Sequence, residues 1–302
     1  MTLAIDSGVS LLAWYKSLCS TDVEAEAVAR LCPVTCARLR DPQHYAAIPF
    51  EVDVRQAQRI DVASISLNWL DEEPGNALIR AIGFEDLGVS AMPYCENRAT
   101  FLRETTESYV ELYSAELKFV EQFLHSIVWL KADRPEASFG SGSFYRVPHV
   151  TFISDASLFF VPPNHQLPRQ HGGLGFLENL FHEALHHQIH AHCAFTRTTY
   201  CVSGVDAFHE LVPFGLRKDR TFTYFQAINA LHVYREISLI RRRLMASANS
   251  LDREFEWLRQ GVQSAQLMWG GFCDALLKVE SNLVQPWPAL IRRWKEEHES
   301  LV

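Results

Sequence analysis

The feature that most constrains this chain is Phe181-His182-Glu183-Ala184-Leu185-His186, which places two histidines four residues apart. On a helix, side chains with this spacing project from the same face. His182 and His186 can then take adjacent positions on one metal ion, with Glu183 beside the metal as a base or an orienting group. The flanking apolar residues recur at helical spacing: Leu177, Leu180, Phe181, Leu185 and Ile189. The sequence therefore predicts a metal-binding helix near the middle of the chain.

A coincidental match is the alternative, because the same segment is rich in histidine. His187, His190 and His192 follow directly. Such a motif is a hypothesis until its structural context is known, and we carry the metal site forward.

Helices dominate the expected fold, which is mainly α with a short β segment (α+β). Apolar periodicity predicts a long helix over 98–132, another from about 223 to 248, and closing helices over 251–280 and 284–298. A Ser/Gly-rich turn at 138–143 leads into a strand over 145–154. Strand and metal helix follow one another in the order in which an edge strand borders a cleft. We expect a helical scaffold around the metal helix, with one or more edge strands just before it.

The domain organisation is expected to include a soft boundary within 71–97, where acidic residues, proline and glycine interrupt the pattern. This gives a helical or mixed N-terminal region at 1–97, a candidate for substrate recognition, and a metal-binding region at 98–302. A single compact unit of 302 residues is the alternative.

Composition limits the class of protein. The net charge of −8 argues against a general nucleic-acid binder, which needs a cationic surface. The seven cysteines are scattered and odd in number, which is not typical of a disulfide framework. The N-terminus lacks the pattern of a signal peptide, and no apolar run reaches the ~20 residues of a membrane span. These features predict a cytoplasmic protein without a membrane partner.

A catalytic metal site needs a third protein ligand and at least one open position. The candidates are Glu210, His232 and Glu236. Glu210 follows His186 at a distance that suits zinc peptidases with a glutamate as third ligand, but its surroundings indicate a loop. His232 and Glu236 lie four residues apart on the predicted helix over 223–248, so they share a face. Spacing alone does not rank them.

The choice of metal has chemical consequences. With zinc, Glu183 would deprotonate a metal-bound water that attacks an amide. An iron(II) ion with three protein ligands and open positions would instead bind a 2-oxo acid and dioxygen, which requires a clamp for the acid's carboxylate. Arg217 and Arg220 lie in a basic loop after the metal helix, and guanidinium groups hold carboxylates well. This loop favours iron.

Four segments together resemble the HExxH-type peptide β-hydroxylases, 2-oxoglutarate-dependent enzymes that modify ribosomally made peptide natural products. They occur in the family's order across roughly residues 125–245: Gly140 to Ser154, the helix Phe181 to Gln188, the loop Leu216-Arg217-Lys218-Asp219-Arg220, and Ala230-Leu231-His232-Val233-Tyr234. The loop departs from the family's usual sequence, because Pro213-Phe214-Gly215-Leu216 precedes the arginine and Thr221 stands where proline is usual.

The resemblance implies that His182, His186 and His232 hold iron(II), and that Arg220 with Arg217 holds 2-oxoglutarate. Glu183 would orient substrate or support the ligands. The reaction implied is hydroxylation of the β-carbon of a residue in a peptide, such as the precursor of a natural product. A zinc-dependent HExxH metallopeptidase, with Glu210 or Glu236 as third ligand, is the alternative.

Overall fold

The computed structural model of the chain describes residues 57–134, 137, 139–144, 147–163, 165–196, 199–216, 221–247 and 256–301. The chain divides into two compact units, and the described residues up to Gln188 form the first while those from Ile189 form the second. This division falls inside helix α6 (Gly172–Thr196), whereas the boundary expected within 71–97 lies in a stretch that belongs wholly to the first unit.

The first unit contains a mixed β-sheet and several helices. Its strands are β1 (Gln58–Val62), β2 (Ile65–Trp69), β3 (Val89–Ala91), β4 (Ser126–Ala132), β5 (Ser141–Phe144) and β6 (Val147–Ser154), with a separate pair β7 (Phe160–Val161) and β8 (His165–Gln166). Its helices are α3 (Glu72–Ala81), α4 (Glu96–Thr106), α5 (Ser114–Phe123) and the first part of α6, with short 3₁₀ turns η3 (Glu85–Leu87), η4 (Glu107–Tyr109), η5 (Asp155–Leu158) and η6 (Arg169–His171). The mainly helical α+β class expected from the sequence is confirmed.

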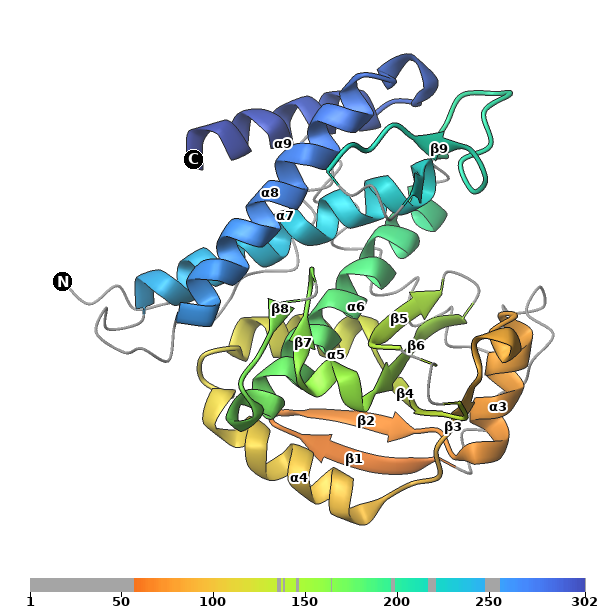
Figure 1. The fold of residues 1–302 in the computed structure, drawn as a ribbon, viewed down its shortest axis with the longest axis vertical. Coiled ribbons are helices and arrows are strands. Elements are labelled where there is room, and N and C mark those ends of the chain that lie inside the picture. Colours follow the sequence, from red (N-terminus) through yellow and green to blue (C-terminus); the bar gives the residue numbers. More distant parts are fainter. Residues whose placement is uncertain are drawn as a thin grey trace. The chain divides into compact units, whose positions relative to one another are not determined.

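The strands of the sheet follow the order β1-β2-β4-β6-β5, and β3 also pairs with β4 (Figure 1). The pairs β2–β4 and β4–β6 are parallel, while β1–β2, β3–β4 and β5–β6 are antiparallel. Among the described residues β5 is therefore the edge strand, although the sequence predicts a turn there. The strand expected over 145–154 is β6, which lies between β4 and β5.

Helices cover both faces of the sheet. On β4, Val128 belongs to an apolar cluster with Leu78 and Ile79 of α3, whereas the neighbouring Trp129 stacks on Phe176 of α6 with ring centroids 6.0 Å apart. Successive side chains of a strand point to opposite faces. The start of α6 therefore lies on the face opposite α3.

The helix expected over 98–132 is wrong in its extent. The chain forms α4, then η4 and α5, and the remaining segment becomes β4, the central strand. Ile127 to Leu130 are all buried, as expected for a central parallel strand that is covered on both faces. A continuous apolar run of this kind has no period by which a strand can be told from a buried helix.

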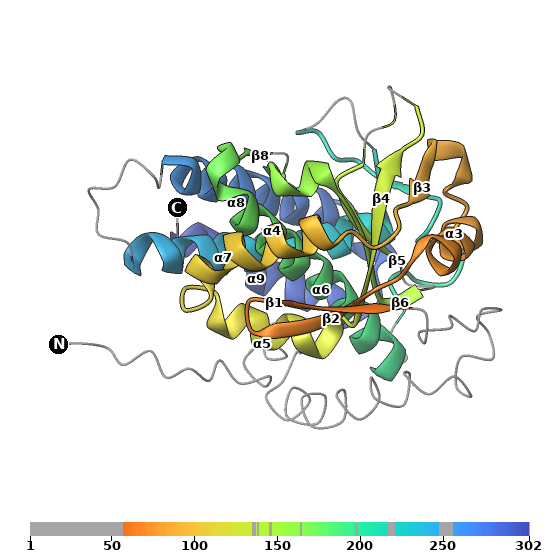
Figure 2. The ribbon, with the colours of Figure 1, turned by 90° about the horizontal axis from the view of Figure 1, so that it is seen from below.

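The second unit is helical. Its elements are the end of α6, the strand pair β9 (Leu211–Val212) and β10 (Phe222–Thr223), α7 (Tyr224–Ser247), α8 (Glu256–Leu277), the 3₁₀ turn η8 (Glu280–Asn282) and α9 (Trp287–Leu301). These helices match the segments predicted over 223–248, 251–280 and 284–298 to within a few residues at most of their ends. Figure 2 shows them in blue. The Arg241 guanidinium is fully buried and donates to the Gly261 carbonyl of α8 over 2.8 Å.

No helix among the described residues is long and apolar enough to cross a membrane. The cysteines in this part of the chain, Cys95, Cys193, Cys201 and Cys273, are free thiols.

The glycines at the start of α6 let it approach α4 closely. A Cβ atom on Gly173 would lie 2.2 Å from the Thr105 carbonyl oxygen, far inside contact distance, whereas a Cβ on the adjacent Gly172 would meet its nearest neighbour, the Phe101 ring, at 3.4 Å. At position 173 the backbone of α4 therefore leaves no room for a side chain larger than the hydrogen atom of glycine.

We expect Gly173→Ala to lower the free energy of unfolding by about 1–3 kcal/mol, the usual cost of overpacking. Gly172→Ala is the matched control and should stay within about 1 kcal/mol of the wild type, because alanine also favours a helix over glycine. Urea unfolding measures both. Equal stability of the two variants would contradict the close contact with Thr105.

Candidate metal centre

The HExxH segment lies within α6, and its two histidines meet as the spacing predicts. The Nε2 atoms of His182 and His186 lie 3.0 Å apart, with the rings inclined at 62°. Both side chains are half-buried. Among the described residues, His182, Glu183 and His186 are the group whose ligand atoms could hold a metal ion, all lying within 4.8 Å of one another.

The separation of the two nitrogens fits a shared metal ion. With metal–nitrogen bonds of about 2.1 Å, two ligands at about 90° lie about 3.0 Å apart, and two at a tetrahedral angle lie about 3.4 Å apart. The observed 3.0 Å matches adjacent positions of an octahedron. The residues present therefore fit two corners of a metal's coordination sphere.

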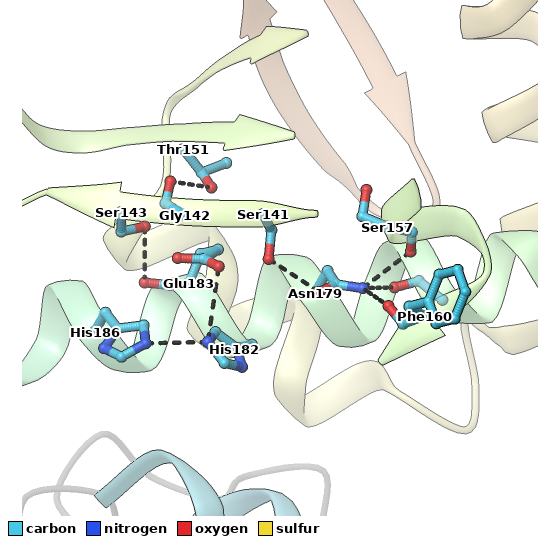
Figure 3. Close-up of polar contacts among 11 residues, drawn as sticks. Ser141, Gly142, Ser143, Thr151, Ser157, Phe160, Asn179, His182, Glu183 and His186 are labelled. Carbon is cyan, nitrogen blue, oxygen red and sulfur yellow. Dashed lines mark hydrogen bonds and ion pairs between the residues drawn. The ribbon is translucent and has the colours of Figure 1, made fainter. Parts of the chain in front are cut away.

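Glu183 points to the sheet rather than to solvent. Its side chain is 1% exposed, and one carboxylate oxygen lies 3.7 Å from His182 Nε2. The hydroxyls of Ser141 and Ser143 of β5 lie near the carboxyl group and lower its pKa, and the Ser143 hydroxyl lies 3.5 Å from the Glu183 carbonyl oxygen. Figure 3 shows Glu183 between α6 and β5.

Burial raises the pKa of the Glu183 carboxyl from its ordinary value of 4.5 to about 7, and the hydrogen bonds from Ser141 and Ser143 oppose this rise. Desolvation disfavours the charged form of an acid. The carboxyl group is therefore poised to gain or lose a proton near neutral pH.

Asn179, one turn before Glu183, holds α6 in place. Its Nδ2 lies 2.8–2.9 Å from three backbone carbonyl oxygens, those of Ser157, Phe160 and Gly175. These acceptors fix the orientation of the amide, so that Oδ1 accepts from the Ser141 hydroxyl over 3.0 Å. Ser141 thus has one proton for two acceptors, Asn179 and Glu183. While it donates to Asn179 it cannot stabilise the Glu183 anion. Desolvation by burial therefore outweighs the serine hydroxyls, and the pKa of Glu183 is raised.

His187, the next histidine of α6, has a structural role. Its Nε2 lies 3.2 Å from the Val150 carbonyl oxygen of β6, and because a carbonyl can only accept, this ring nitrogen is the donor. His187 also stacks against His149 with ring centroids 6.0 Å apart. In the second unit, His190 stacks on Phe225 and His192 is fully buried.

The candidates for the third ligand lie in the second unit. His232 on α7 is fully buried and stacks against Trp294 of α9 with ring centroids 6.0 Å apart. Glu236, one turn later, is 4% exposed and forms an ion pair with Arg235. Glu210 is exposed, and its carboxylate accepts from the Asp206 backbone N–H over 2.9 Å. The group His182–Glu183–His186 belongs to the first unit, and the third ligand stays a prediction.

The proposed 2-oxoglutarate clamp, Arg217 and Arg220, lies outside the described residues. The chain on either side of it is described: Phe214 and Phe222 both pack against Phe272 of α8, with ring centroids 4.2 and 4.9 Å away.

Sequence reasoning missed Ser141, Ser143 and Asn179. Two signals were available. Asn179 precedes Glu183 by four residues, which places the two on one face of a helix, and Ser141 and Ser143 are two apart, which places them on one face of a strand. Composition predicts a turn at these serines instead, because glycine and serine favour loops.

Comparison with models of known protein families and with the curated proteins finds no match to this chain.

Glu183 should make the metal-free protein less stable as the pH rises. Because its folded-state pKa of about 7 lies above the ordinary 4.5, the folded state binds more protons than the unfolded state between these values, and the free energy of unfolding falls across this window. The total loss is on the order of 3 kcal/mol. Glu183→Gln should remove that part of the slope.

Urea unfolding of both metal-free proteins from pH 4.5 to 8 measures the effect. As the pH rises, the free energy of unfolding of Glu183→Gln should increase relative to that of the wild type. A constant difference would show that the carboxyl group is not desolvated.

Proposed function

We propose that this protein is an iron(II)- and 2-oxoglutarate-dependent oxygenase that hydroxylates the β-carbon of a residue in a peptide. The observation that carries the proposal is the 3.0 Å separation of His182 Nε2 and His186 Nε2, which matches two adjacent positions of an octahedral metal ion. The resemblance of residues 125–245 to the HExxH-type peptide β-hydroxylases supplies the substrate class and the second cofactor.

When bound, iron with 2-oxoglutarate would supply the activation of dioxygen needed to oxidise an unactivated C–H bond. The chain itself would contribute by positioning the metal ligands and Glu183. α6 directs His182 and His186 to one side, and Glu183 is held against β5 by the serine hydroxyls. A carboxyl group with a pKa near 7 can hydrogen-bond as an acid or as a base, and so can orient a polar group of the substrate.

Metal binding should depend on both histidines of the motif. After anaerobic reconstitution with iron(II), we expect the wild type to retain about one iron per chain, and His182→Ala and His186→Ala to lose most of it, because each removes one of few ligands. Elemental analysis measures the metal. The control is His209→Ala, which alters an exposed histidine whose Nδ1 lies 2.7 Å from Asp206.

Under air, the iron-loaded wild type with 2-oxoglutarate and a pool of linear peptides should form succinate and add one oxygen atom to a peptide. Mass spectrometry follows both products. Iron retention without any succinate would contradict the proposed reaction.

The third ligand requires a separate comparison. We expect His232→Ala to lose iron, and Glu236→Gln and Glu210→Gln to keep it, because the two carboxylates already bind Arg235 and the Asp206 N–H. Circular dichroism of each variant checks that the protein is folded. If His232→Ala keeps its iron and one glutamine variant loses it, the ligand assignment moves to that glutamate.

A zinc metallopeptidase is the second candidate, and the pKa of Glu183 favours it. A general base works best when its pKa lies near the working pH, and that of Glu183 is about 7. Zinc-loaded protein that cleaves the same peptide pool without 2-oxoglutarate would establish this function in place of the first.

A further inference from the structure

β5 ends the sheet, with β6 as its partner among the described residues. The backbone groups on the other side of an edge strand are available for pairing with another chain. β5 also borders the candidate metal centre, because Ser141 and Ser143 contact Glu183.

The pairing with β6 shows which backbone groups face outward. Ser154 N–H donates to the Gly140 carbonyl, and the register places Ser141 opposite Ile153 and Gly142 opposite Phe152. In an antiparallel pair, hydrogen-bonded and non-hydrogen-bonded residues alternate. Gly142 therefore directs its N–H and C=O toward β6, whereas Ser141 and Ser143 direct theirs away from it.

These outward groups make no backbone hydrogen bond with the rest of the described chain. Ser141, Gly142 and Ser143 are also half-buried rather than buried, and their side chains are small enough for another strand to approach closely. Figure 3 shows β5 running beside α6, with Ser141 near Asn179 and Ser143 near Glu183.

We propose that β5 binds the peptide substrate as an added β-strand, paired with the backbone of Ser141 and Ser143. The proposal rests on the proposed function in that the bound chain is the substrate. A peptide in extended conformation offers donors and acceptors that repeat every two residues, about 6.8 Å, which is the spacing of the outward groups on Ser141 and Ser143. A paired strand lies about 4.8 Å from β5 and so passes beside the group His182–Glu183–His186.

Backbone pairing supplies affinity without reading side chains. The edge would therefore accept peptides of varied sequence, and pockets elsewhere would choose the residue to be modified. A compact small molecule lacks the repeating donors and acceptors and would not use this edge.

The probe is a displayed library of random nine-residue peptides, selected on the full chain loaded with iron(II) under argon. Enriched peptides are then measured on two variants by fluorescence anisotropy. Ser143→Ala keeps the outward N–H and removes the hydroxyl that contacts Glu183. Ser143→Pro also removes the N–H, at an edge position where the pairing with β6 does not use it.

We expect Ser143→Pro to bind the enriched peptides about fivefold to tenfold more weakly than Ser143→Ala, the effect of one lost hydrogen bond and a ring at the edge. A second measurement uses the unmodified protein. N-methylation along the best peptide should weaken binding at alternate residues, since only every second N–H of a paired strand faces β5.

Failure to enrich any peptide, which would follow if the chain's own residues or a second copy closed the edge, overturns the proposal. So does equal binding by Ser143→Pro and Ser143→Ala when both are folded, or an N-methylation pattern without alternation. Because these measurements involve no turnover, peptide binding without succinate formation would reject the proposed reaction and leave the binding edge standing.

Discussion

The buried side chain of Asn179 is the contact on which the geometry of the metal helix depends. Its amide nitrogen lies within 2.9 Å of three backbone carbonyl oxygens, in η5, at the start of β7 and in α6 itself, and its amide oxygen accepts from Ser141 of β5. Leaving buried polar groups without partners costs about 1–3 kcal/mol for each group. The helix is therefore held at one rotation and one height against the edge of the sheet, which sets the directions of the residues that follow.

That rotation gives the neighbouring members of the motif different surroundings. Adjacent residues of a helix differ by about 100° in direction, so a helix that turns His182 and His186 to one side turns Glu183 to another. Here the other side is the sheet, where Glu183 meets the serines of β5 and loses contact with water. The same carboxyl group in an open cleft would be ionised at neutral pH. Its position beneath an edge strand links the acid–base properties of the centre to the strand that we propose as the peptide-binding edge.

Much of the helical framework was predictable, because α6, α7, α8 and α9 are long and strongly periodic or end at clear signals. The segment over 98–132 was not, since its last residues, Ile127 to Leu130, are apolar without a period and become the central strand. β5 was also missed as a strand. Its sequence Ser-Gly-Ser-Phe has little strand propensity, and pairing with β6 rather than local preference makes it extended.

The sequence by itself determined that two histidines and a glutamate share one helix, and that their spacing suits a metal, because a helix has a known period. Through resemblance, it also predicts His232 as a further metal ligand and Arg217 and Arg220 as residues that hold 2-oxoglutarate. Only the tertiary structure decided the environment of that helix: Glu183 is buried against Ser141 and Ser143, and their strand is the edge of the sheet among the described residues. These features depend on contacts between residues some forty positions apart, and such contacts are set by packing and desolvation rather than by local sequence.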